Sequence, residues 1–178
     1  LESGLFFRLD ASNVLEKNTA SIIMPIGFDH KDFLIKGTID EIVYEKCSHL
    51  LSGSKIFISE QKHNILEKIK KNIVNNTSEK IIFGKDYNYK KNSNNFVYDD
   101  SLGQIDLPLP NLLGDFQISN VSTAIATSRK LDEFKISDLN IKQAITKIRS
   151  EGRLQKITQG RLRNYVSKNN QILIDGAH

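Results

Sequence analysis

Apolar residues in the first half of the chain form short continuous runs that alternate with amphipathic stretches. The runs at 19–26, 55–59 and 81–83 are bounded by polar or glycine-containing segments, which predicts buried strands. Between them, 40–51 and 64–74 carry apolar residues at three- to five-residue spacing, which predicts helices with one buried face. This strand, helix, strand, helix, strand order is typical of a parallel α/β sheet.

The helix ends and buried faces can be assigned from residue types. Asp40 is a plausible N-cap of the first helix, and Gly53 a plausible C-terminal stop. In the second helix, Ile65, Ile69 and Ile73 recur every four residues, which predicts that they stack on one buried face.

The middle of the chain has a different pattern. Three short β-type segments, 87–89, 96–98 and 104–109, are separated by turns rich in Lys, Asn, Ser and Gly. We therefore predict a small antiparallel sheet attached to the parallel one.

Helical patterns return at 116–131 and at 137–149, where Ser137 is a plausible N-cap. In the first of these helices, the small residues Ala124 and Ala126 predict close packing on a neighbour. The expected buried stripe of the second helix consists of Leu139, Ile141, Ala144, Ile145 and Ile148.

The composition changes again after Glu151. Segments 154–157, 161–166 and 171–174 read as strands, so a helical part gives way to a new sheet. We place a domain boundary near Gly152, which divides the chain into residues 1–151 and 152–178.

Composition narrows the class of protein. Hydrophobic residues make up 39% and charged residues 26%, as in ordinary globular proteins, and no apolar run approaches the ~20 residues of a membrane span. The single cysteine, Cys47, excludes an internal disulfide and a cysteine-based zinc cluster, which favours a reducing compartment. The net charge of +4 is dispersed, and 87–91 (YNYKK) is the one short stretch that mixes basic and aromatic residues. We predict neither a nucleic-acid partner nor a membrane partner.

Both ends of the chain are abrupt. The sequence begins without an initiator Met, and its last strand leads directly into Asp175 and His178. Ligands of open α/β sheets bind beyond the carboxyl ends of strands, so these two residues are candidate site residues. We expect the chain to be an internal piece of a longer protein.

Two further candidates lie in the first half. His30 follows a buried-type strand. At this position a histidine can face a ligand crevice, or it can form a purely structural hydrogen bond. Glu45 and Lys46 read most simply as an exposed charged pair on a solvated helix face, although Lys46 directly precedes Cys47 of the buried stripe.

Three candidates in the second half have equally simple alternatives. The Asn120 amide can donate and accept at once, which suits a purine edge, but a residue near a helix start also bonds nearby backbone. Arg153 at the hinge could reach a phosphate or remain an exposed charge. Asp175 could accept ribose hydroxyl groups or form an Asx-type turn.

Six stretches in a fixed order resemble the folylpolyglutamate synthase and dihydrofolate synthase family of the Mur ligase superfamily. Its typical motifs are EVGLGGRLDATN, GLDH, EKAGI, QxxNAAxA, GRL(E/Q) and LDGAHNP. The corresponding stretches here are 2–13 (ESGLFFRLDASN), 27–30 (GFDH), 45–49 (EKCSH), 117–124 (QISNVSTA), 152–155 (GRLQ) and 174–178 (IDGAH). The resemblance implies a Mur-ligase-like central ATPase domain, followed by the first strands of a Rossmann-like C-terminal domain.

The resemblance also implies a metal site. Glu2 and His30 would be ligands of a Mg²⁺ ion that bridges to the ATP phosphates, and Lys46 would be the lysine that the superfamily carbamylates, so that His30 and Lys46 would serve catalysis. Mg²⁺ prefers oxygen ligands, so the histidine ligand rests on the resemblance alone.

The remaining implied roles concern the nucleotide. Asn120 would contact adenine, Arg153 would contact phosphate, and Asp175 with His178 would contact the nucleotide from the second domain. The implied reaction is phosphorylation of a dihydropteroate or folate carboxylate by ATP, followed by attack of the amino group of L-glutamate. The parent protein would be a cytoplasmic monomer.

Some positions depart from the family pattern. Phe6-Phe7 replaces Gly-Gly, Met24-Pro25 precedes the GFDH stretch, and Phe116 replaces a histidine. Two alternatives therefore remain: another Mur-type amino-acid ligase, or a degenerate non-catalytic nucleotide-binding module. The GRLQ and RLDASN stretches favour the folate branch. The family's glycine-rich phosphate loop would precede Glu2, so we expect residues 1–178 alone not to turn over substrate.

Overall fold

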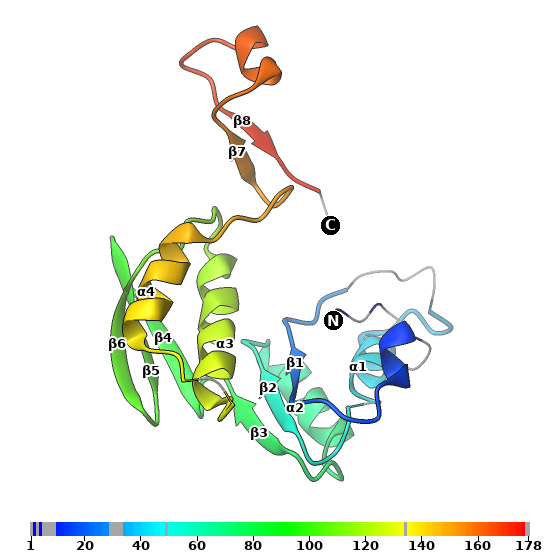
Figure 1. Cartoon of the computed structure of the whole chain (residues 1–178). Coiled ribbons are helices and arrows are strands. Elements are labelled where there is room, and N and C mark those ends of the chain that lie inside the picture. Colours follow the sequence, from blue (N-terminus) through cyan, green and yellow to red (C-terminus); the bar gives the residue numbers. More distant parts are fainter. Residues whose placement is uncertain are drawn as a thin grey trace.

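The computed structural model describes residues 2, 4, 10–28, 34–48, 50–133 and 135–176. Figure 1 shows three groups of elements, a three-stranded sheet with two helices, a second three-stranded sheet with two helices, and a small C-terminal hairpin. Among the described residues, no helix is both long and apolar enough to cross a bilayer.

The first sheet is parallel, as predicted. It contains β1 (Ala20–Ile23), β2 (Lys55–Ile58) and β3 (Glu79–Ile82) in the order β1-β2-β3. The register pairs the first residues of the three strands with one another, so their carboxyl ends lie along one edge. That edge is where ligands of open α/β sheets are expected.

The two faces of the parallel sheet pack against different elements. Ile56 and Ile58 of β2 pack with Val43 of α1 (Ile39–Cys47) and Ile69 of α2 (His63–Asn72). Phe57, which points to the other face, joins the core beneath α3 (Phe116–Lys130). This division follows from the two-residue side-chain period of a strand.

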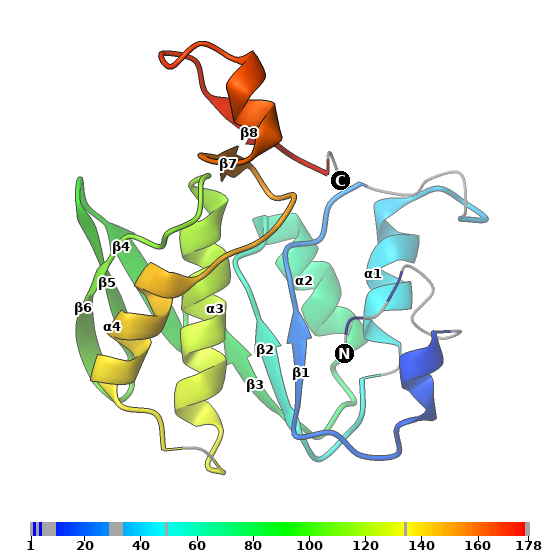
Figure 2. The same cartoon turned by 45° about the horizontal axis from the view of Figure 1, so that its top comes forward.

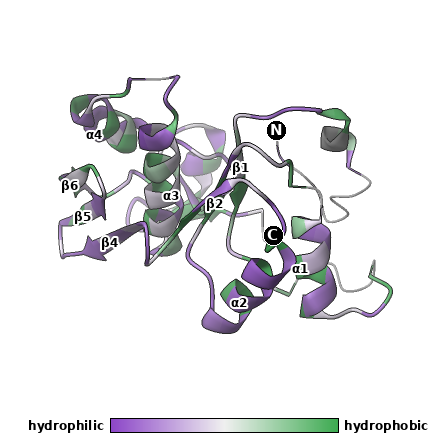
Figure 3. Ribbon diagram, turned by 90° about the horizontal axis from the view of Figure 1, so that it is seen from below, coloured by the Kyte–Doolittle hydropathy of each residue, from purple (hydrophilic) through white to green (hydrophobic). Residues whose placement is uncertain are grey.

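The predicted stripe of α2 is confirmed, because Ile65, Ile69 and Ile73 are all buried. Figure 3 shows green apolar positions on α2 separated by purple polar ones, as expected for an amphipathic helix. The predicted ends of α1 are wrong. Its N-cap is Thr38, and the helix ends at Cys47, so Gly53 lies in the later turn before β2 with φ of 84°.

The second sheet is antiparallel, as predicted, with β4 (Tyr87–Lys91), β5 (Asn95–Asp100) and β6 (Gly103–Pro108) in sequence order. A single parallel bridge between Phe83 and Tyr87 links its first strand to the end of β3. Both views in Figures 1 and 2 place α3 between the two sheets, and one core contains residues from all three parts.

The helices of the second half are confirmed as α3 and α4 (Asp138–Lys147), with Ser137 as the N-cap of α4. The buried face of α3 is wider than predicted and includes polar residues such as Gln117 and Thr123, whereas that of α4 is narrower. Ala126 is buried but Ala124 is exposed. In α4 the core contact rests on Ile141 and Ile145, whereas Leu139 and Ala144 face solvent.

The C-terminal segment forms an antiparallel pair of β7 (Gln155–Ile157) and β8 (Ile172–Ile174). The strand predicted at 161–166 is wrong, because Arg161–Tyr165 is a 3-10 helix, η4. A second short 3-10 helix, η2 (Ala11–Val14), precedes β1. The domain boundary near Gly152 stays a prediction.

Candidate functional site

At the carboxyl edge of the parallel sheet, a glutamine side chain links the segments that follow two neighbouring strands. Gln61, three residues beyond the end of β2, accepts a hydrogen bond from the Ile26 N–H at 3.0 Å and donates one to the Met24 carbonyl at 2.9 Å. The segment after β1 is thereby tied to the segment after β2. Sequence reasoning missed Gln61, although a polar residue just beyond a buried strand is a recognisable signal.

Lys46 lies in the last turn of α1 and reaches back to the N-terminal segment. Its Nζ donates a hydrogen bond to the carbonyl oxygen of Gly4 at 3.0 Å, across 42 positions of sequence. The Gly4 N–H in turn donates to Asp10 Oδ2 at 2.7 Å. The structure therefore brings Gly4, two positions after the exposed Glu2, to the end of α1.

Glu45 and Lys46 are not the exposed pair of the simplest interpretation. Glu45 is buried, with 4% of its surface exposed, and Lys46 is half-buried. Lys46 therefore lies at the boundary between the core and solvent, where its amine contacts the N-terminal backbone.

The donors near Lys46 suit a divalent cation only under one condition. Among the described residues, no three His, Cys, Asp or Glu side chains gather closely enough to hold a metal ion. An ammonium group repels a cation, whereas a carbamate on the same nitrogen offers carboxylate-like oxygens of the kind that Mg²⁺ prefers. Lys46 and Glu2 fit a cation site only with that modification, and His30 lies outside the described residues.

Asn120 lies in the second turn of α3 and is oriented by its neighbour. Its Nδ2 donates to Gln117 Oε1 at 3.1 Å, and Gln117 is buried. Within the described part of the chain, Asn120 Oδ1 has no hydrogen-bond partner. One acceptor and one remaining amide hydrogen are available for a ligand.

A buried hydroxyl network fixes α3 beneath Asn120. Thr123 Oγ1 lies 2.9 Å from Ser59 Oγ and 3.1 Å from the Tyr87 hydroxyl, which also donates to the Ile58 carbonyl at 3.1 Å. Burial raises the pKa of Tyr87 to about 12, so its proton stays in this network. The network therefore fixes the position of α3 relative to the carboxyl end of β2.

The C-terminal hairpin brings the backbone segments that carry Arg153 and Asp175 side by side. Asp175 Oδ2 accepts a hydrogen bond from the Leu154 N–H at 2.8 Å, and the Gly176 N–H donates to the Gly152 carbonyl at 2.7 Å. Leu154 has φ of 47°, so this contact accompanies an uncommon backbone conformation. Arg153 is exposed, and His178 lies outside the described residues.

Figure 2 shows this hairpin on the same side of the molecule as the carboxyl ends of β1 and β2. The described site residues thus fall into three places: the Lys46 contact, the start of α3, and the hairpin. Within the described chain, Asn120 makes no hydrogen bond to either of the other two places.

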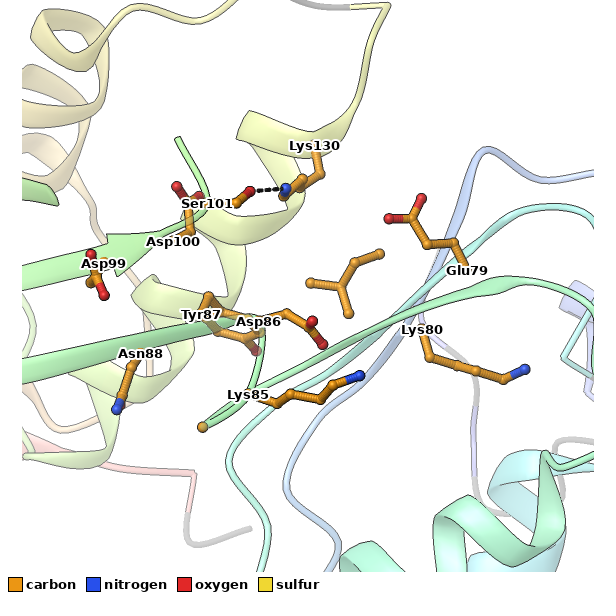
Figure 4. A pocket seen from close by; sticks show the side chains of 12 residues that line it. Glu79, Lys80, Lys85, Asp86, Tyr87, Asn88, Asp99, Asp100, Ser101 and Lys130 are labelled. Carbon is orange, nitrogen blue, oxygen red and sulfur yellow. Dashed lines mark hydrogen bonds between the residues drawn. The ribbon is translucent and has the colours of Figure 1, made fainter. Parts of the chain in front are cut away.

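A separate hollow of about 410 Å³ lies beside the outer edge of β3 (Figure 4). Lysine and carboxylate side chains line it, and Lys130 Nζ donates to Ser101 Oγ at 2.6 Å there. Of the predicted site residues that the structure describes, none borders this hollow.

Comparison with known proteins identifies the fold. No protein-family model matches the chain. Its backbone matches the apo form of L. casei FPGS with a TM-score of 0.80 at 26% identity, covering 100% of this chain and 43% of that one. An FPGS–AMPPCP–folate complex matches with a TM-score of 0.82 at 26% identity, again over 100% and 43%. E. coli FolC in complex with DHPP and ADP matches with a TM-score of 0.79 at 24% identity over 99% and 38%, a likeness of fold alone.

The parallel sheet, the antiparallel sheet and their shared helix therefore have the Mur ligase fold, which confirms the predicted fold class. In sequence, the chain is 27% identical over 187 residues to folylpolyglutamate synthase of Lacticaseibacillus casei. The family resemblance predicted from the six motifs is confirmed. The match covers all of this chain and 41% of that relative's length.

Proposed function

We propose that these residues belong to an ATP-dependent ligase that adds L-glutamate to dihydropteroate, to folates, or to both. The observation that carries the proposal is the match over the whole chain to folylpolyglutamate synthase, a protein whose structural relatives include a complex with AMPPCP and folate. The lone, buried Cys47 agrees with a cytoplasmic protein. We further propose that the parent protein acts as a monomer.

Lys46 is the proposed metal-bridging residue, in carbamylated form, with Glu2 and His30 as further ligands of Mg²⁺. Support comes from the position of the amine at the end of α1, against the N-terminal backbone that carries Glu2. When bound, the ion would offset the negative charge of the phosphate oxygens. The contribution of Lys46 itself would be to hold oxygens at a place where an unmodified amine would oppose a cation.

The nucleotide would lie between the start of α3 and the C-terminal hairpin. Asn120 would meet the adenine edge, Arg153 a phosphate, and Asp175 with His178 the nucleotide from the second domain. Supporting observations are the oriented amide of Asn120 and the pairing of the Arg153 and Asp175 segments through the Leu154 N–H. The boundary near Gly152 would serve as the hinge, where a φ of 67° suits glycine.

The chemistry proceeds in two displacement steps. An oxygen of the substrate carboxylate attacks the terminal phosphorus of ATP, and ADP leaves. The amino nitrogen of glutamate then attacks the acyl carbon, phosphate leaves, and the nitrogen releases its proton as the amide forms. Exclusion of water by closure of the hairpin over the sheet edge would protect the acyl phosphate from hydrolysis.

The direct test uses the longest natural chain that contains residues 1–178. We expect it to form a glutamyl amide only when ATP, L-glutamate and a pteroate or folate acceptor are all present, with one ADP released per glutamate added. Mass spectrometry of the products, with a panel of other amino acids and carboxylate acceptors, separates the folate ligase from another Mur-type ligase. Absence of any ATP-dependent product, with intact folding, would support the degenerate module instead.

A second test addresses Lys46. Lys46→Arg retains the positive charge but cannot carry the carbamate, so we expect at least about a hundredfold loss of turnover. Lys71→Arg is the matched control, because Lys71 also lies in the last turn of a helix, α2. Incubation with ¹³C-labelled bicarbonate should give a carbamate NMR signal in wild type and not in Lys46→Arg. Full activity of Lys46→Arg would refute the role of the carbamate.

A further inference from the structure

Phe116 is an exposed aromatic residue at the start of α3. It begins the helix, and 56% of its surface is exposed. Asn120 follows four positions later, so the two side chains project from the same side of the helix. Gln117, which orients the Asn120 amide, is buried directly behind them.

The Phe116 ring is held in place by Gly114. A β-carbon built on Gly114 would lie 2.4 Å from Phe116 Cε1 and 3.0 Å from Cδ1, so the ring rests directly on the glycine backbone. Gly114 also has φ of 103°, a conformation that favours glycine. Asp115, the residue between Gly114 and Phe116, forms an exposed ion pair with Lys91 at 2.6 Å. The ring is therefore supported on one side and exposed on the other.

We propose that Phe116 is the platform on which the nucleobase stacks, with Asn120 reading the polar edge of the same base. This inference rests on the proposed function, because it assumes that a nucleotide binds at the start of α3. A supported aromatic ring with one open face loses little conformational freedom when a planar base covers it. The free acceptor of Asn120 lies one helical turn away and can receive an exocyclic amine.

The two residues have separable roles. Stacking contributes affinity without choosing the base, because every base has an aromatic face. A hydrogen-bonding amide instead distinguishes bases by their donors and acceptors. Loss of Phe116 should therefore weaken all nucleotides alike, whereas loss of Asn120 should change the ratio of ATP to GTP affinity.

The test measures binding of ATP, GTP and inorganic tripolyphosphate by calorimetry, in the longest natural chain that contains residues 1–178. For Phe116→Ala we expect about 5- to 100-fold weaker binding of ATP, and the same factor for GTP. Tripolyphosphate binding should not change. Phe116→Tyr should retain wild-type affinity, and Phe116→Leu should behave like Phe116→Ala. Leu102→Ala, which removes a similarly exposed apolar side chain in the β5–β6 turn, is the control.

Gly114→Ala is a second variant that leaves both Phe116 and Asn120 in the chain. The added methyl group must displace the ring, so ATP binding should weaken as in Phe116→Ala. Circular dichroism and thermal melts identify any variant that fails to fold. Unchanged ATP affinity in folded Phe116→Ala, or wild-type affinity in Phe116→Leu, overturns stacking while nucleotide binding stands. A wild-type protein that binds tripolyphosphate but neither ATP nor GTP overturns the inference and the proposed function together.

Discussion

Arg129 should be one of the most destabilising positions to change. Its Nε lies 3.2 Å from Asp100 Oδ2, and the two side chains are only 8% and 0% exposed. The Nε–H does not point at that oxygen, so the contact is Coulombic, while Nη1 donates to Asp138 Oδ1 at 2.9 Å. Arg129→Met keeps the apolar stem but leaves the Asp100 carboxylate buried without its cation.

Breaking a buried ion pair by removing one partner costs about 3–5 kcal/mol. Two donors would remain on Asp100 after the change, the Tyr98 hydroxyl at 3.0 Å and the Leu102 N–H at 2.8 Å. They partly solvate the carboxylate, so we expect the lower part of that range, about 3 kcal/mol. A domain of ordinary stability has only about 5–15 kcal/mol in total, so this loss should be plain in a urea titration followed by circular dichroism.

Two other variants control and test the stability loss expected for Arg129→Met. Lys70→Met removes an exposed pair with Glu67 on α2 and should cost less than about 1 kcal/mol. Arg129→Met combined with Asp100→Asn removes both charges, so the double variant should be more stable than the sum of the single losses predicts. An Arg129→Met loss no larger than the Lys70→Met loss would refute the reasoning that Asp100 is a desolvated charge.

Two titratable groups give further predictions. Burial raises the pKa of the Cys47 thiol to about 12. At neutral pH, iodoacetamide should therefore label Cys47 only at the rate at which the folded protein unfolds around it. Rapid labelling would contradict a buried thiol. Burial also raises the pKa of Tyr87 to about 12, above the ~10 of an unfolded chain. The folded state therefore binds this proton more tightly, and its stabilising effect is complete below pH ~10 and is lost as the pH rises toward ~12. Urea titrations across that interval should show falling stability, with a smaller decline in Tyr87→Phe, whereas equal declines would count against Tyr87 as the source.

Element types along the chain could be predicted from periodicity, but helix ends could not. The first helix is capped by Thr38, whose Oγ1 accepts the Glu41 N–H at 3.3 Å. Asp40, the predicted cap, instead pairs with Lys68 of α2. A partner 28 residues away competes for the carboxylate, and local sequence rules contain no information about it.

The strand prediction for 161–166 was wrong for a related reason. The composition suggested a strand, but the Arg163 guanidinium donates to the carbonyls of Val166, Ser167 and Lys168. A side chain that satisfies three carbonyls lets the backbone turn into a 3-10 helix and a loop without strand pairing. The pattern of polar and apolar residues does not reveal such a contact.

The placement of Lys46 against the N-terminal stretch was predictable from motif order, while its role in a metal site stays a prediction. The contact between Lys46 and the Gly4 carbonyl joins two stretches that the family motifs had already linked. Gln61 and the support of Phe116 by Gly114 were not predictable, because both depend on where one loop lies against another. Such contacts depend on the tertiary fold and produce no periodic pattern in the sequence.

The position of α3 between two sheets has a consequence for how this fold can change. One face of the helix meets Phe57 of the parallel sheet, and the same core includes Phe96 and Leu107 of the antiparallel sheet. α4 adds Ile141 and Ile145 to this core from beside β6, whereas α3 contacts strands of both sheets. Replacement of the antiparallel sheet by another module during evolution would therefore require a new complementary surface for α3, and insertions should be better tolerated at strand turns than within this shared layer.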